Sequence, residues 1–179
     1  LEELVLELTD LDFREQDGVR RASARAQLVH HSATPGQEPV YSVQLWRFVA
    51  PLGPIEAGEL RWYLEQYAVW PSTYFSDRAR KVEESLVTWG RLLHEAAMPV
   101  AHTANVMQSW ARIDGRAGRR FSVHVNAGTE AGAPEDEVSA AKEAATALLG
   151  LPWELLHDER DFLFQGAEPT RVRRRLPNT

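Results

Sequence analysis

The sequence predicts an α/β fold in which an antiparallel β-meander precedes a helical segment and a βαβ unit. Apolar residues alternate with polar ones in 3–8 and 21–28, which is the period of strands. From 60 to 110 they recur every three or four positions, which is the period of amphipathic helices. Strand, helix and strand patterns then follow one another from 120 to 176, an order typical of parallel strands joined by a crossover helix.

Residues 1–50 predict the meander. Leucines at every second position of 3–8 indicate a first strand, and Asp17-Gly18 marks a turn. Alanines and a leucine at every second position of 21–28 indicate a second strand. Because these side chains are small, we expect the strand to lie close to the layer that covers it.

A loop and a third strand complete this first segment. Residues 31–39 hold serine, threonine, two prolines and glycine, a composition typical of loops. Residues 41–49 predict the third strand, with Val43 and Leu45 on one face.

The middle segment, residues 51–118, opens on a Pro-Leu-Gly-Pro break and predicts three helices. The first has an apolar face over 60–67 and ends at Trp70-Pro71. The second begins at Ser76 or Asp77 and stops at Pro99, and the third covers 101–111. The expected apolar faces comprise Leu60, Tyr63, Leu64 and Tyr67; Val82, Leu86, Trp89, Leu92, Leu93 and Ala96; and Val106, Met107 and Trp110.

The last segment, residues 119–179, predicts the βαβ unit. Residues 120–126 alternate as a strand does, and an acidic first turn favours a helix from 135 to 149. Alternation returns over 170–176 in a second strand. One face of that strand is expected to carry Val172, Arg174 and Leu176, and the other Arg171, Arg173 and Arg175.

The connection between this helix and strand is dense in apolar residues. Gly150 and Pro152 end the helix, because glycine suits a helix C-terminus and proline cannot continue it. Trp153, Leu155 and Leu156 then form an apolar plug that includes the polar Glu154. Core packing is the first interpretation of four tryptophans on predicted buried faces: Trp62, Trp89, Trp110 and Trp153.

Composition bounds the function. The 179 residues suffice for one domain with a substantial core. A formal net charge of −6 argues against general nucleic-acid binding, and no apolar run is long enough to predict a membrane span. The absence of cysteine excludes disulfides and thiolate chemistry in this chain and is compatible with the cytoplasm. A start without methionine leads us to expect an excised or processed piece.

No pattern identifies a catalytic, metal-binding or cofactor-binding residue. His30 and His31 are neighbours on a strand and point to opposite faces, so we interpret them as polar residues of a strand end rather than a metal site. Metalloprotease, serine-hydrolase and phosphate-loop motifs do not occur. The glycine- and arginine-rich residues 115–120 are interpreted as a loop.

Two blocks resemble a known family. Residues 151–158 read Leu-Pro-Trp-Glu-Leu-Leu-His-Asp and are followed by Phe-Leu and a basic Arg-Arg-Leu-Pro strand. Residues 60–67, followed by Trp70-Pro71, form the second block. Both are similar to stretches of the CHAT domain, a caspase- and separase-like family of cysteine peptidases often found with TPR repeats. The resemblance covers most of residues 55–177.

The resemblance implies a caspase-like sheet with flanking helices. It also implies that the catalytic His and Cys lie downstream of the Pro-Trp-Glu-Leu-Leu block, so this chain resembles only the amino-terminal part of such a domain. We therefore expect a non-catalytic lobe that scaffolds the catalytic half, relays activation from a TPR or other regulatory partner, and meets protein substrate only through that half. The alternative is a stand-alone protein–protein interaction module.

Five residues are candidates for contact with a partner. Arg171, Arg173 and Arg175 form either a solvated strand face that discourages edge pairing or a contact surface for an acidic partner or the catalytic half. Trp153 and Glu154, from the plug, complete the set.

Overall fold

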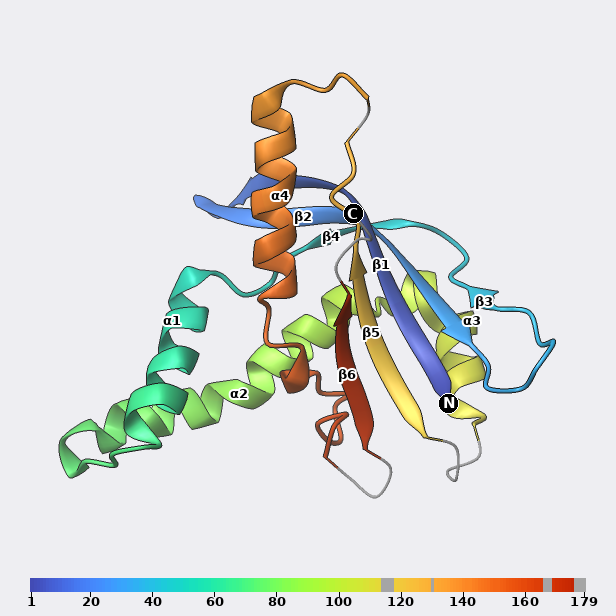
Figure 1. Ribbon diagram of the computed structural model, residues 1–179. Coiled ribbons are helices and arrows are strands. Elements are labelled where there is room, and N and C mark those ends of the chain that lie inside the picture. Colours follow the sequence, from blue (N-terminus) through green and yellow to red (C-terminus); the bar gives the residue numbers. More distant parts are fainter. Residues whose placement is uncertain (114–117, 130, 166–168, 176–179) are drawn as a thin grey trace.

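The computed structural model describes residues 1–113, 118–129, 131–165 and 169–175, which form a mixed sheet and its covering helices (Figure 1). The α/β fold class is therefore confirmed. The strands are β1 (Glu2–Gln16), β2 (Val19–His31), β3 (Val40–Tyr41), β4 (Trp46–Val49), β5 (Arg119–Val125) and β6 (Thr170–Arg175). The helices are α1 (Pro54–Trp62), α2 (Ser76–Ala97), α3 (Val100–Ala111) and α4 (Glu135–Leu149), with the short helical turns η1 (Tyr63–Tyr67), η2 (Thr73–Phe75) and η3 (Trp153–Leu155).

The sheet combines an antiparallel and a parallel part. Its order is β3-β2-β1-β5-β6, and β4 pairs with the far end of β2. Strand β2 pairs antiparallel with β1, β3 and β4, as the predicted meander requires. Strand β5 pairs parallel with both β1 and β6, so the predicted βαβ unit is confirmed. The first strand of the chain thus lies in the middle of the sheet.

Strands β1 and β2 form one long hairpin that extends beyond the expected strands. The turn at Asp17-Gly18 is confirmed, and both residues have positive φ, at 52° and 71°. The register shifts between Thr9 and Asp12, where Asp10 also has a positive φ of 48°. This bulge bends the hairpin, and its distal half crosses the middle of α4 (Figure 1).

The core lies on one face of the sheet. Leu4, Leu6 and Leu8 alternate into it, together with the alanines of β2 and with Phe121, Val123 and Val125 of β5. Helices α2, α3 and α4 bury their own apolar residues in the same cluster, so all three pack on this face. The alanines of β2 are fully buried opposite an α4 face that is itself alanine-rich, which confirms the expected close packing.

The third predicted strand is wrong over its middle. The chain leaves the sheet between β3 and β4, and Val43 and Leu45 are 73% and 50% exposed. Ser42 binds Leu28 through both its backbone and its hydroxyl, and the Val43 amide donates to the His102 carbonyl of α3. These bonds replace the continuous ladder that the alternation predicted.

The first predicted helix is also different. It begins at Pro54, and its turn over 63–67 has π geometry; none of its expected apolar face is buried. Together with the start of α2 it forms an arm that projects from the body (Figure 1, lower left). Arg78 of α2 lies over the Trp62 ring and pairs with Glu59, so the arm's helices pack on each other rather than on the sheet.

The remaining predictions hold in large part. Helices α2, α3 and α4 begin and end close to the expected residues, although Leu92 is 42% exposed rather than buried. Trp110 and Trp153 are buried, whereas Trp62 and Trp89 are only partly so. Residues 114–117 of the glycine- and arginine-rich loop and Leu176 lie outside the described residues. No helix in the described ranges could cross a membrane.

Candidate functional site

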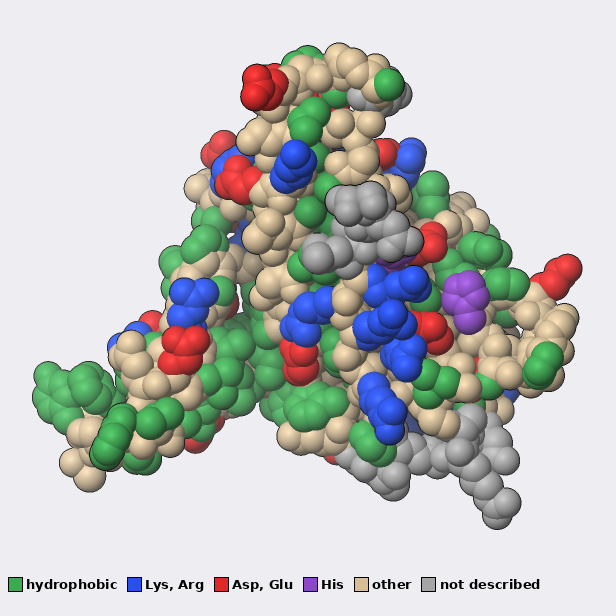
Figure 2. All heavy atoms as spheres, in the orientation of Figure 1, with side chains coloured by type: hydrophobic (Ala, Val, Ile, Leu, Met, Phe, Trp, Pro, Cys, Tyr) green, Lys and Arg blue, Asp and Glu red, His purple; other side chains and the backbone are tan. Residues whose placement is uncertain are grey.

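No helix among the described residues covers the sheet face opposite the core, and arginines gather on this face. Arg171, Arg173 and Arg175 are exposed there, because these alternate positions of β6 point away from the helices. Figure 2 shows Lys and Arg side chains clustered over β5 and β6. The predicted arginine row therefore exists as a surface of the folded chain.

Neighbouring strands extend this basic row. Arg171 is in register with Arg120 of β5, and Arg175 with His124. Arg120 lies 3.8 Å from the Glu3 carboxylate, which also accepts a hydrogen bond from Ser122. Among the described residues, Arg171, Arg173 and Arg175 form no ion pair. This arrangement concentrates positive charge on one surface, where like charges in adjacent positions repel one another.

Strand β6 is also an edge of the sheet. The strand order ends there, so the outer side of residues 171–175 pairs with no other strand in the described part of the chain, whereas the Thr170 amide donates to the Leu163 carbonyl. An unpaired row of N–H and C=O groups is a template for a further strand. The basic row and the open edge therefore meet on one element.

Arg174 points to the opposite side and fastens β6 to the plug. Its guanidinium binds both oxygens of Glu154, at 2.5 and 2.6 Å, and donates to the carbonyls of Leu149 and Leu151. Burial alone would raise the pKa of Glu154, but the hydrogen bonds and charge of Arg174 outweigh it and hold that pKa below its ordinary value. Glu154 thus forms an intramolecular ion pair with Arg174, and this pair holds β6 against the plug.

Trp153 is the centre of the plug. Its ring is fully buried against Phe48 and Phe121, with centroids 5.8 and 6.0 Å away, and its Nε1–H donates to the Leu148 carbonyl at 2.9 Å. Of the five predicted contact residues, the structure therefore groups only the three arginines on a free surface. Trp153 offers no exposed surface, and Glu154 lies on the other side of β6.

A buried polar network lies at the start of β1. His30 Nε2 is 2.7 Å from the Glu2 carboxylate, and His30 Nδ1 is 2.9 Å from Ser109 Oγ of α3. Glu2 also accepts from the Ala33 amide at 3.0 Å. The sequence suggested only a polar strand end at His30, because its partners are far away along the chain. The network fastens β1 and β2 to α3.

The Glu2 carboxylate should make stability depend on pH. Burial raises the pKa of Glu2, but hydrogen bonds from Ala33 and His30 and the attraction of His30 more than offset it, so that pKa lies below its ordinary value of 4.5. A carboxyl whose folded pKa is depressed stabilises the fold above its unfolded pKa and loses that contribution as the pH falls through the folded pKa.

We therefore expect Glu2→Gln to lower the free energy of unfolding by about 1–3 kcal/mol at neutral pH, because one acceptor of the network is lost. The difference from the parent should shrink as the pH falls below 4.5. Urea titrations between pH 7 and pH 3 measure both effects. Glu7→Gln, on the same strand and without a hydrogen bond or ion pair among the described residues, is the control. A pH-independent difference would contradict this assignment.

Other titratable groups do not form a site of their own. Burial lowers the pKa of His94, an effect that Asp158 and other nearby acids only partly oppose, and its Nε2 has no hydrogen-bond partner in the described residues. No group of three His, Asp or Glu side chains that could hold a metal ion occurs among the residues that the structure describes. No protein-family model, curated protein or solved structure matches this chain.

Proposed function

We propose that this chain is the amino-terminal, non-catalytic lobe of a CHAT-type cysteine endopeptidase. In this proposal it scaffolds a catalytic half that supplies the His and Cys, and the two halves meet at the open face and edge of β6. In the whole peptidase, a cysteine thiolate activated by histidine would attack the peptide carbonyl, and both residues would belong to that other half.

One observation supports this proposal above the others: in the described part of the chain, helices cover the parallel strands β1, β5 and β6 on one face only. Sheets of parallel strands occur almost always with both faces covered, because their connections place helices on each side. The arginines of β6 project from this uncovered face and form no ion pair with the described residues, and β6 is also the edge strand of the sheet. A second half that added a strand to the β6 edge and a layer over the uncovered face would cover all three features.

The alternative, a stand-alone interaction module, has support from the arm. Trp70 and Tyr74 are 82% and 85% exposed there, and Leu64 and Val69 are also largely exposed. An exposed apolar patch of this kind is typical of a protein-binding surface. In the lobe proposal the arm is the place where a TPR or other regulatory partner would act.

Charge reversal on the basic row tests the docking surface. Arg173→Glu combined with Arg175→Glu should weaken association with the catalytic half at least about tenfold, because two favourable charge contacts become repulsive. The measurement is capture of that half by the tagged lobe in its own host, with a thiol-reactive active-site probe to detect the cysteine peptidase. If both halves are one polypeptide, the readout is the rate of probe labelling.

Arg91→Glu provides the matched control, since Arg91 is an exposed arginine of α2 on the helical side. It should leave capture and labelling unchanged. Equal capture by the double variant and the parent would remove the basic row from the interface. An intact mass near 20.2 kDa, with no cysteine peptidase captured, would favour the stand-alone module instead.

A further inference from the structure

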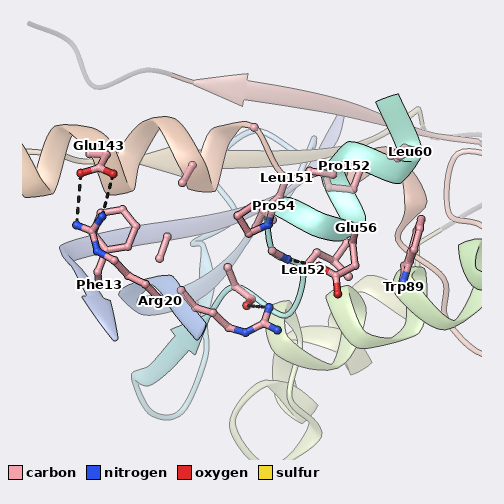
Figure 3. A pocket seen from close by; sticks show the side chains of 17 residues that line it. Phe13, Arg20, Leu52, Pro54, Glu56, Leu60, Trp89, Glu143, Leu151 and Pro152 are labelled. Atoms are coloured by element: carbon pink, nitrogen blue, oxygen red, sulfur yellow. Dashed lines mark hydrogen bonds and ion pairs between the residues drawn. The ribbon is translucent and has the colours of Figure 1, made fainter. Parts of the chain in front are cut away.

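A cavity of about 460 Å³ lies between α1, the C-terminal half of α4 and the distal part of the β1–β2 hairpin (Figure 3). Its walls are mainly apolar, and this volume is within the range of small-molecule sites. The largest apolar side chains that line it are Phe13, Leu52, Leu60, Trp89, Leu151 and Pro152.

Small residues explain why the cavity is open. Alanines from four different segments line it, at positions 22, 50, 57 and 147. Ala57 of α1 and Ala147 of α4 are exposed at its mouth, so larger side chains there would fill the cavity without entering the core. The space is therefore set by residue size on its walls.

The two arginines of the cavity differ in how their charge is balanced. Arg20 lies over the Phe13 ring and pairs with both oxygens of Glu143, as Figure 3 shows. Arg21 donates only to two backbone carbonyls, those of Ala50 at 3.3 Å and Pro51 at 3.0 Å. These bonds orient the Arg21 guanidinium but leave its charge unpaired within the described residues.

One acid on the wall, Glu56, lies near Arg21 without pairing with it: a Cβ at Gly53 would be 3.4 Å from Glu56 Oε2 and 3.5 Å from Arg21 Nη1. Glu56 accepts a hydrogen bond from the Gly53 amide at 2.7 Å, where it caps the start of α1, and it forms no ion pair with Arg21. An apolar space with one oriented guanidinium that has no ion-pair partner in the described part of the chain is complementary to an apolar molecule with one anionic end. Arginine binds a carboxylate especially well because its planar fork can donate two parallel hydrogen bonds.

We propose that this cavity binds a small apolar carboxylic acid, with the carboxylate on Arg21 and the hydrocarbon body against Leu60, Trp89 and Leu151. None of the residues that line this cavity belongs to the basic row of β6. The test of ligand binding is therefore independent of the lobe proposal. Binding would join α1 to the end of α4 and so couple the arm to the body of the domain.

Titration calorimetry of the full chain with decanoate and with decanol tests this proposal. Decanoate should bind at least about tenfold more tightly than decanol, the factor that a charge-assisted hydrogen bond supplies. Arg21→Gln should remove that difference. Ala57→Phe, which fills the mouth, should abolish binding of both ligands, and this variant keeps the test valid if Arg21→Gln does not fold.

Ala104→Phe is the matched control, because Ala104 is an exposed helical alanine of α3 outside the cavity. It should bind both ligands as the parent does. Equal affinity for decanoate and decanol, or binding that survives Ala57→Phe, would overturn the proposal. So would an absence of saturable binding accompanied by a loss of self-association in Ala57→Phe, which would identify a second copy of the chain as the occupant.

Discussion

Gly90→Ala should lower the free energy of unfolding by about 3 kcal/mol or more, because α2 and η3 touch at this glycine. A Cβ at position 90 would lie 2.0 Å from the Leu155 carbonyl oxygen and 2.9 Å from the His157 Cβ. The backbone of the plug is held there by the His157 amide, which donates to the Gly90 carbonyl. It cannot move away without losing that bond and the packing of Trp153.

A destabilising effect would be opposite to helix propensity, because alanine is favoured over glycine in a helix interior by roughly 1 kcal/mol. Gly58→Ala is the matched control: Gly58 is also helical, and a Cβ there would meet nothing within 4 Å. It should be neutral or stabilising. Guanidinium denaturation followed by circular dichroism compares the two variants. A Gly90→Ala variant as stable as its parent would contradict the close approach of the plug.

Trp153→Ala should destabilise the fold by about 3–5 kcal/mol, the cost typical of deleting a large buried aromatic side chain. Trp153 is fully buried and joins β4, β5 and the end of α4 through Phe48, Phe121 and the Leu148 carbonyl. Its loss would leave a cavity and remove one of the hydrogen bonds that the Leu148 carbonyl accepts, another of which comes from the Leu151 amide. Because Arg174 anchors β6 to the same plug, the strand edge should also become disordered.

Trp70→Ala is the control for this substitution, since Trp70 is 82% exposed on the arm. It should change the free energy of unfolding by less than about 0.5 kcal/mol. Hydrogen exchange of the β6 amides provides a second readout: Trp153→Ala should expose them and Trp70→Ala should not. Unchanged β6 protection in a folded Trp153→Ala variant would show that the plug does not hold the strand.

Local patterns were enough to predict most of the elements. The alternation in β1, β2, β5 and β6 and the periodicity of α2, α3 and α4 show which residues of one element share a face, and this depends only on local sequence spacing. The turn at Asp17-Gly18 and the acidic start of α4 are also local signals. The sequence alone therefore determined the α/β class, the antiparallel hairpin and the βαβ unit.

The sequence patterns gave wrong predictions where the hydrogen bonds or apolar contacts of a segment are made with something other than the sheet. Val43 and Leu45 alternate as strand residues do, but the chain there bonds to α3 and leaves the ladder. The apolar residues of the arm repeat as a buried helix would, yet they pack on one another or stay exposed. Periodicity reports that a face is apolar and does not report what covers it.

The arrangement of the candidate sites required the tertiary structure. The parallel pairing of β1 with β5 joins residues more than 100 positions apart, and it creates the open face on which the arginines of β6 gather. The network of Glu2, His30 and Ser109, and the clamp of Arg174 on Glu154, likewise join distant segments. The sequence determined which strand carried the arginine row. Only the folded chain decided that this row is exposed, that Trp153 is buried, and that Arg21 lines a cavity without an ion pair in the described residues. Each of these depends on contacts between elements rather than within them.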